Sequence, residues 1–85
     1  MNDIKTRAEQ GQVSAQIKMG LWHLDDSNGV AEDSVEAAKW FRKAAEQGHA
    51  LAQSMLGAMY YAGLGVTKDH AEMVKWVSKA AEQGD

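Results

Sequence analysis

The sequence predicts an all-α fold, a short α/α solenoid of two helix-turn-helix repeats with a leading partial helix. The first observation is a motif, Lys-Ala-Ala-Glu-Gln-Gly at residues 43–48, that returns at residues 79–84. A degraded copy, Thr-Arg-Ala-Glu-Gln-Gly, occupies residues 6–11. The second observation is that apolar residues recur at helical spacing between the copies, which favours helices packed on two sides. A repeat period in this range is typical of stacked helical units.

The chain of 85 residues is expected to form a single repeat domain. Residues 1–11 are predicted to be the tail of a partial unit, residues 12–48 the first repeat and residues 49–84 the second. About three units are usually needed to stabilise such an array, and a chain of this length buries a modest share of its surface. We therefore expect a domain of marginal stability.

The first predicted helices follow from apolar spacing and from end signals. Residues 1–10 are predicted to be the end of a helix, because Gly11 stands where a helix C-terminus favours a left-handed backbone. Residues 12–25 form the next predicted helix. Its apolar residues recur at positions i, i+4, i+8 and i+11: Val13, Ile17, Leu21 and Leu24.

The second helix of the first repeat is predicted over residues 34–47, after a polar turn at residues 25–29. Asp33 followed by Glu36 is the pattern of a helix N-cap, and Gly48 ends the helix. The residues expected to face inward are Ala37, Trp40, Phe41, Ala44 and Ala45.

The second repeat is predicted to contain helices over residues 50–62 and 70–83, with Asp69 as the cap of the latter. The inward residues of this last helix are expected to be Met73, Trp76, Val77 and Ala80. Glycine within a helix costs ~1 kcal/mol relative to alanine, so mid-helix glycines indicate a close contact with another helix. We expect large tryptophans to fill these contacts, with Trp40 and Trp76 facing Gly20 and Gly57.

These residues resemble the Sel-one-like repeat, a relative of the tetratricopeptide repeat. The second unit carries its pattern in Ala52-x-x-x-Leu56-Gly57-x-x-Tyr60, Gly63-x-Gly65-Val66, Asp69, and Trp76-x-x-Lys79-Ala80-Ala81-x-x-Gly84. The first unit carries it in Ala15, Gly20, Gly29-Val30, Asp33, Ala37, Trp40, Lys43-Ala44-Ala45 and Gly48. The resemblance covers residues 8–84, and two matches at one period make it specific.

The resemblance implies an α-solenoid whose first helices form a concave face, and a role as an adaptor or scaffold module in protein complexes. This chain departs from the pattern at three places of the first repeat. Met19 replaces the usual leucine, His23 replaces the usual tyrosine, and Asp26 stands where the second unit has Gly63. We therefore expect the first repeat to pack less tightly. The secreted subtype with a cysteine pair in every unit does not apply, because the chain has no cysteine.

The composition narrows the classes of partner and the cell compartments that the sequence favours. The net charge is −3 with both signs mixed along the chain, which argues against nucleic acid or an anionic membrane as the main partner. No apolar run approaches the ~20 residues that span a bilayer, and residues 1–5 lack the apolar run of a signal peptide. We expect a cytoplasmic protein, or a periplasmic or secreted one if a leader has been removed.

The sequence predicts no catalytic, cofactor-binding or metal-binding residues. No two of the three histidines have the spacing of a zinc site. His23 is expected to occupy the core position of the usual tyrosine, and His49 and His70 are expected to be solvated. The glycines of Gly63-x-Gly65 are expected to serve a tight interhelix loop, because no strand precedes them.

Residues 26–29, Asp-Ser-Asn-Gly, resemble part of a calcium loop. An EF-hand would need an acidic residue at position 24 and glutamate at position 35, where this chain has Leu24 and Val35. The segment is therefore interpreted as a turn.

Two interaction surfaces are predicted. By the tetratricopeptide analogy, the groove positions of the first helices are Ile17, Leu21, Leu24, Asp25, Leu51, Ala58, Tyr61 and Ala62. Partner binding is expected at Leu21, Leu24, Asp25, Ala58 and Tyr61, because exposed apolar residues usually mark an interface. For Ile17 and Leu51, packing on a neighbouring helix is expected to be at least as favoured as exposure in the groove.

The second predicted surface is an end of the array. Neither end is expected to carry an all-polar capping helix, and terminal repeats normally need a polar outer face. Met73 and Val77 are therefore predicted to mediate association between copies. The leading function is a protein-interaction or scaffold module that binds a protein or peptide in the groove. The alternatives are a structural homo-oligomer that assembles through its repeat ends and, from another class, a small hydrolase.

Overall fold

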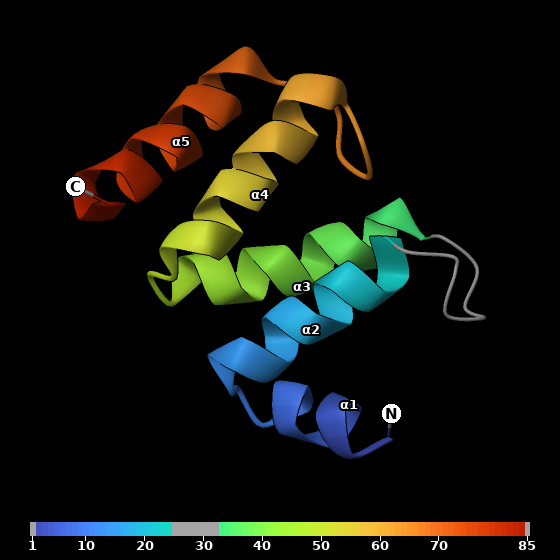
Figure 1. The fold of residues 1–85 in the computed structure, drawn as a ribbon. Coiled ribbons are helices and arrows are strands. Elements are labelled where there is room, and N and C mark those ends of the chain that lie inside the picture. Colours follow the sequence, from blue (N-terminus) through green and yellow to red (C-terminus); the bar gives the residue numbers. More distant parts are fainter. Residues whose placement is uncertain (1, 25–32, 85) are drawn as a thin grey trace.

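The computed structural model describes residues 2–24 and 33–84, and Figure 1 shows that these residues form a stack of helices. The helices are α1 (Asn2–Glu9), α2 (Val13–Leu24), α3 (Ser34–Glu46), α4 (Ala50–Ala62) and α5 (His70–Gly84). The described residues contain no strand. The all-α prediction is confirmed, and the helix bounds agree closely with those expected from spacing and glycine positions.

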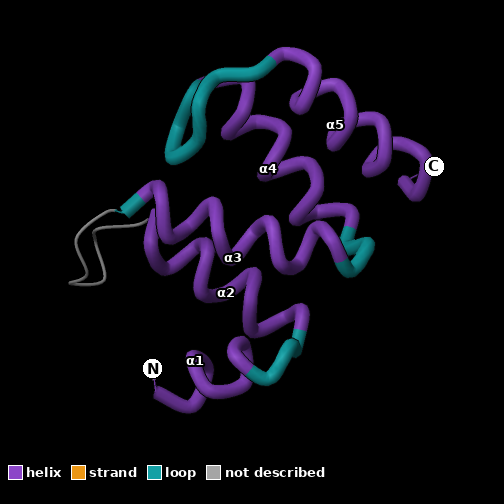
Figure 2. Tube along the Cα trace, turned by 180° about the vertical axis from the view of Figure 1, so that it is seen from behind, coloured by secondary structure: helices purple, strands orange, loops and turns teal. Residues whose placement is uncertain are grey.

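The helices follow one another through the stack in chain order. Each helix packs mainly on the helix before it and the helix after it. The turns between α1 and α2 and between α3 and α4 lie on the same side of the stack, and α1 and α5 lie at its opposite ends (Figures 1 and 2). This is the arrangement of a short solenoid, in which each helix buries its apolar residues against its sequence neighbours.

The helix ends use the predicted signals. The Asp33 carboxylate accepts a hydrogen bond from the backbone N–H of Glu36, and Asp69 does the same for Glu72, each at 3.1 Å. Such N-caps satisfy donors that have no partner within the helix. Gly11 and Gly48 both have a φ of 94°, a left-handed conformation that glycine adopts without steric cost. The repeated motif therefore ends in the same turn in two of its copies.

The described residues contain two groups of buried apolar side chains. The larger group lies between α2 and α5 and contains Phe41 and Leu56, the largest side chains that are fully buried. The smaller group lies at the N-terminal end of the stack and consists of Ala8, Ala15, Met19 and Trp40, with Ile4 packed against it. Trp40 and Trp76 thus belong to different clusters, each facing the preceding unit.

The prediction that tryptophans fill the space beside the mid-helix glycines is wrong. A Cβ added to Gly20 would lie 2.8 Å from the ring of Phe41, and one added to Gly57 would lie 2.7 Å from Cγ2 of Val77. Phe41 and Val77 are the residues that follow the two tryptophans, and they project from a different face of their helices. A difference of one residue turns a helical side chain by about 100°, so the contact falls on the neighbouring position.

Candidate interaction surfaces

The exposed residues of α4 form one stripe along the helix. They recur at the spacing of a single helical face: Leu51, Ser54, Ala58, Tyr61 and Ala62. All but one are apolar, and Tyr61 and Leu51 are 64% and 51% exposed. Of the two alternatives left open for Leu51, the structure therefore shows the exposed one. The opposite face of α4 is buried against α3 and α5, so the stripe is free for a partner.

The corresponding face of α2 is less apolar. Leu21 is 46% exposed, but Lys18 and Ser14 share its exposed face. Ile17 is buried in the core, so of the two alternatives left open for this residue it adopts packing on neighbouring helices. Leu24 is half-buried and packs against the same core. Asp25, the remaining predicted groove residue, lies outside the described residues, as do Asp26 and the interpreted turn at residues 26–29.

The two ends of the stack differ in chemistry. The exposed residues described on α1 are all polar: Asp3, Lys5, Thr6, Arg7 and Glu9. As expected, α1 is not an all-polar helix, because Ile4 and Ala8 belong to it, but both pack inward and its exposed face is polar. On α5, Val74 and Val77 are exposed by 46% and 42%. Val77 was expected to face inward as well, and it does contact Gly57 with one methyl group.

Met73 contributes less to the end face than predicted. Its side chain is half-buried and packs against the larger core cluster. Val74, its neighbour in the sequence, is the more exposed residue. The apolar surface of α5 is therefore made by Val74 and Val77, which lie three residues apart and on the same side of the helix.

A ladder of glutamines connects the units, and the sequence reasoning missed it. Gln16 and Gln53 are both buried, and their Nε2 atoms donate to the carbonyl oxygens of Ala8 and Ala45, each at 3.2 Å. Each also accepts a hydrogen bond, Gln16 from Gln47 and Gln53 from Gln83, at 2.8 Å. Buried amides need such partners. The signal was present, because an Ala-Gln pair recurs at residues 15–16 and 52–53.

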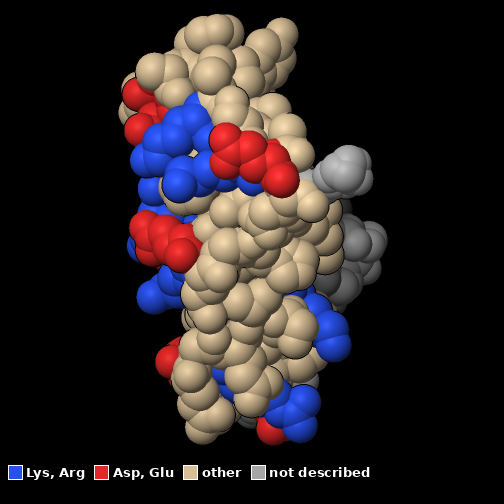
Figure 3. Space-filling view, turned by 90° about the vertical axis from the view of Figure 1, so that its left-hand side faces the viewer, with Lys and Arg blue, Asp and Glu red and all other residues tan. Residues whose placement is uncertain are grey.

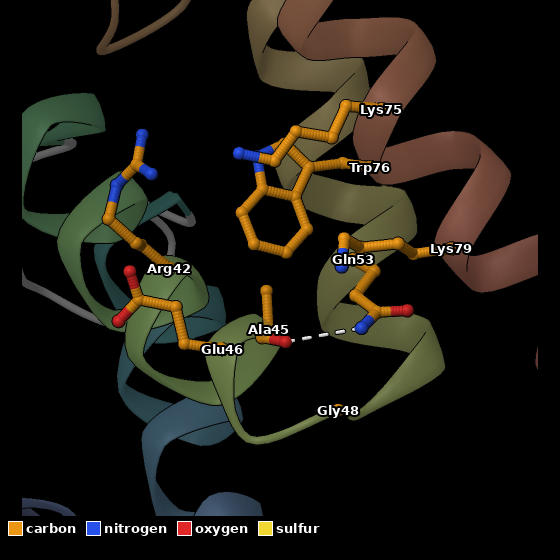
Figure 4. A pocket seen from close by; sticks show the side chains of 8 residues that line it. All are labelled: Arg42, Ala45, Glu46, Gly48, Gln53, Lys75, Trp76 and Lys79. Atoms are coloured by element: carbon orange, nitrogen blue, oxygen red, sulfur yellow. Dashed lines mark hydrogen bonds between the residues drawn. The ribbon is translucent and has the colours of Figure 1, made fainter.

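A pocket of about 370 Å³ lies between α3 and α5, with α4 at its base. Figure 4 shows Arg42 and Glu46 on α3 facing Trp76 across the pocket, while Lys75 and Lys79 extend from α5 toward α3. The other lining residues are Ala45, Gly48 and Gln53. No sequence motif had singled out this cluster, because its basic residues come from two helices far apart in the chain.

Most of the charged groups in the pocket are held by neighbours. The Arg42 guanidinium donates to the Tyr60 hydroxyl and lies 5.5 Å from the centroid of the Tyr60 ring. The amino groups of Lys75 and Lys79 lie 4.9 Å and 5.9 Å from the Trp76 ring. Glu72 contacts Lys75 at 3.7 Å and accepts from the Trp76 indole N–H at 3.2 Å. Cation–π contacts of this kind hold the lysines over the indole.

Charge is unevenly distributed over the surface. Figure 3 shows most charged side chains of both signs along the left of the view and further basic ones at the lower right, with a surface free of charged residues between them. The pocket lining carries three basic residues, Arg42, Lys75 and Lys79, against one acidic residue, Glu46. The whole chain, in contrast, has a net charge of −3. The basic character of the pocket is therefore local.

The histidines do not come together. His23 is half-buried at the end of α2, and the backbone N–H of Asp33 donates to its carbonyl oxygen at 2.8 Å, as Asp69 does to Tyr60 at 3.1 Å. His23 thus occupies the position of that tyrosine. His49 is half-buried with an enclosed Nδ1, which corrects the expectation that it is solvated.

Within residues 2–24 and 33–84, no group of three or more histidine or acidic side chains is arranged to hold a metal ion. None of the helices described has the length and apolarity required to cross a membrane.

Comparison with known proteins gives consistent matches. The model of the Sel1 repeat matches residues 13–49 and 50–85. The structure is similar to a Sel1 repeat protein from Oxalobacter formigenes, with a TM-score of 0.94 and 42% identity, over 100% of this chain and 24% of that one. It is also similar to c5321, a protective antigen of uropathogenic Escherichia coli with an SLR fold, with a TM-score of 0.90 and 44% identity, over 96% and 17% of the two chains.

One curated relative is a eukaryotic protein. The chain is 31% identical over 62 residues to HRD3A of Arabidopsis thaliana, a component of an ERAD-associated E3 ubiquitin-protein ligase. The match covers 73% of this chain and 9% of that protein. The chain therefore spans less than a quarter of the length of each of these three proteins.

Proposed function

Because the chain belongs to the Sel1 repeat family, whose repeats mediate protein–protein interaction, we propose that it is a scaffold module that binds a segment of a partner protein on α4. The proposed surface is the exposed stripe centred on Tyr61, with Ala58 beside it, together with Leu21, which is exposed on α2. Leu24 and Asp25, the other two residues predicted to bind a partner, follow Leu21 closely in the sequence. Sel1 repeats are a non-catalytic fold, and no arrangement within the described residues favours the hydrolase alternative.

The exposure of Tyr61 is the observation that carries the proposal. A tyrosine that is 64% exposed beside Ala58 and Ala62 leaves an apolar surface in water, and aromatic residues are enriched where interfaces form. Tyrosine also contributes a large contact area with few rotatable bonds, so it loses little entropy when a partner covers it. The HRD3A relative is named as a component of a ligase assembly, which is in keeping with a scaffold role.

The test is capture of partners from the source cell with wild-type chain and with Tyr61→Ala. We expect a specific protein to be retained by the wild type and lost with the variant. Val35→Ala is the matched control, because Val35 is 53% exposed and belongs to α3, which is not part of the proposed surface. Circular dichroism must show equal helicity for the three proteins. Retention of the same partners by Tyr61→Ala would overturn the proposal.

We propose association between copies through α5 as a second function, because a specific contrast favours it. Positions 38 and 41 of α3 hold Ala38 and Phe41, which are buried, whereas the equivalent Val74 and Val77 of α5 are exposed. The N-terminal end has polar exposed residues, so two copies would pair their α5 helices rather than join head to tail. Such a contact is isologous and closes as a dimer.

Sedimentation equilibrium tests this second function. We expect concentration-dependent dimers of the wild-type chain and monomers of Val74→Glu. Val35→Glu, which adds the same charge to another exposed valine, should leave the dimer intact. A wild-type monomer at the highest concentration reached would overturn the association.

A further inference from the structure

We propose that the pocket between α3 and α5 binds a carboxylate group of a protein segment. The basis is the juxtaposition of Arg42, Lys75 and Lys79 around the Trp76 indole (Figure 4). This site is separate from the α4 stripe, because its charged lining side chains come from α3 and α5. Binding at one surface can therefore fail without affecting the other.

The base of the pocket is rigid. Trp76 is 5% exposed and donates its indole N–H to Glu72. Gln53 is buried and is held by two hydrogen bonds, to Ala45 and from Gln83. A base with fixed rotamers positions the cations without a further entropy cost when a ligand arrives. The base of the pocket is therefore preorganised for a ligand.

The three cations line one space between α3 and α5. Arg42 is fixed by Tyr60, on the α3 side of the pocket. Lys79 lies over the indole on the α5 side, and no ion pair is recorded for it among the described residues. Guanidinium and ammonium groups are strong donors to carboxylates. An anion between α3 and α5 would be within reach of both.

The charge balance indicates a ligand with a single negative charge. Three cations and Glu46 line the pocket, which leaves two positive charges. Glu72, which contacts Lys75, lowers this to one. A carboxylate matches this remaining charge, whereas a doubly charged phosphate would leave one negative charge uncompensated in a pocket that Glu46 also lines. A carboxylate beside an apolar indole face fits an acidic peptide.

The same set of residues recurs one unit earlier in the sequence. The equivalents of the charged and aromatic lining residues are Lys5, Glu9, Lys39, Trp40 and Lys43. The geometry recurs in part, because the Lys43 amino group lies 5.9 Å from the Trp40 ring, as Lys79 does from Trp76. A partner that presents carboxylates at intervals would contact both places, and binding at two linked places raises the overall affinity.

The tryptophan side chains provide a direct readout. The chain has three tryptophans, so their indole N–H signals can be followed separately by NMR. Trp76 reports on the pocket, Trp40 on its equivalent, and Trp22 on α2 serves as the reference. The first probe is a blocked Gly/Ser peptide with two glutamates, compared with its glutamine counterpart. The second probe is a Gly/Ser peptide with a free C-terminal carboxylate, compared with its amide.

We expect the Trp76 signal to shift at millimolar peptide with at least one carboxylate probe and with neither neutral counterpart. A shift with the glutamate peptide alone identifies a side-chain carboxylate, and one with the free C-terminus alone identifies a terminal carboxylate. Lys79→Gln should weaken binding by about two- to fivefold, the effect of an exposed charge pair. Lys18→Gln, an equal change of charge on α2, should leave it unchanged.

Three results would overturn the proposal. The first is that the Trp76 signal does not move with either carboxylate peptide. The second is that Lys18→Gln weakens binding as much as Lys79→Gln does. The third is that inorganic phosphate shifts the Trp76 signal more than acetate does at equal ionic strength. This third result would show that the pocket prefers phosphate to a carboxylate. Because Tyr61→Ala leaves the pocket intact, it should not change the peptide affinity, and this separates the pocket from the α4 surface.

Discussion

Helices α3 and α5 occupy equivalent places in the two repeats, yet their outer faces have different surroundings. Phe41 on α3 is fully buried because α4 and α2 pack on that helix. Val77, its equivalent on α5, is 42% exposed because α5 packs mainly on α4 and no further helix of the described residues follows it in the stack. In a repeat protein, burial at a given position therefore depends on the next unit, and equal sequence positions do not have equal energetic weight.

The largest expected effect concerns this pair of residues. Phe41→Ala should lower the free energy of unfolding by about 3–5 kcal/mol, because it removes a fully buried ring, whereas Val77→Ala should cost about 1 kcal/mol or less because its side chain is half exposed. Urea denaturation measures both. If Phe41→Ala does not fold, Phe41→Leu provides the comparison with a smaller loss. Equal losses for the two positions would show that α5 is covered in solution.

The glutamine ladder should also show a contrast between a buried residue, Gln53, and an exposed one, Gln83. Gln53→Ala leaves the Ala45 carbonyl and the Gln83 amide without their partner. It should lower the free energy of unfolding by about 1–3 kcal/mol, because Ala45 is buried. Gln83→Ala should cost less, because Gln83 is exposed and water can replace its bond. Denaturation midpoints of the two variants, measured side by side, give the difference. A Gln53→Ala protein as stable as the wild type would refute the structural role of the ladder.

The mid-helix glycines extend the comparison to backbone contacts. In Gly20→Ala the new Cβ would meet the buried Phe41 ring, and overpacking of this kind costs about 1–3 kcal/mol, offset by a gain of about 1 kcal/mol in helix propensity. In Gly57→Ala it would meet the half-exposed Val77 methyl group, which has room to move. We expect Gly20→Ala to melt at a lower temperature than Gly57→Ala. The reverse order would mean that Val77 is the more confined side chain.

The helix caps are where the two repeats should behave alike. Asp33→Ala and Asp69→Ala each remove one hydrogen bond to a backbone N–H at 3.1 Å, and each should cost about 1 kcal/mol. The effects should add in the double variant because the sites are distant and share no partner. Thermal unfolding of the two single variants and the double variant checks this. A much larger loss at one cap would show that its helix has another role in the stack.

Much of the fold follows from local patterns in the sequence. The turns at Gly11 and Gly48 and the caps at Asp33 and Asp69 depend on nearby residues, so the helix bounds could be predicted well. The partner of Gly20 could not, because one step along α3 decides whether Trp40 or Phe41 faces it. Side-chain direction across an interface depends on how the two helices cross, and periodicity does not specify that crossing.

The candidate surfaces were predicted less completely. Tyr61 was expected on the outer face from its register alone, and it is exposed; its role in binding stays a prediction. The core position of Ile17 shows that register alone does not decide burial. The pocket escaped notice because Arg42 and Lys79 meet only in three dimensions, and no spacing rule connects them. The polar character of α1 needed the structure as well, since it depends on which side of a short helix is covered.

The most direct measurement of the central proposal is photo-crosslinking from single positions of the intact chain. A benzophenone amino acid would replace Tyr61 on the α4 stripe, Val77 on the α5 face or Val35 as the exposed control. After irradiation in the source cell, the account predicts a crosslink from position 61 to a distinct partner protein, and none to that partner from position 35. A partner that crosslinks from position 77 and not from position 61 would contradict the assignment of the binding surface to α4.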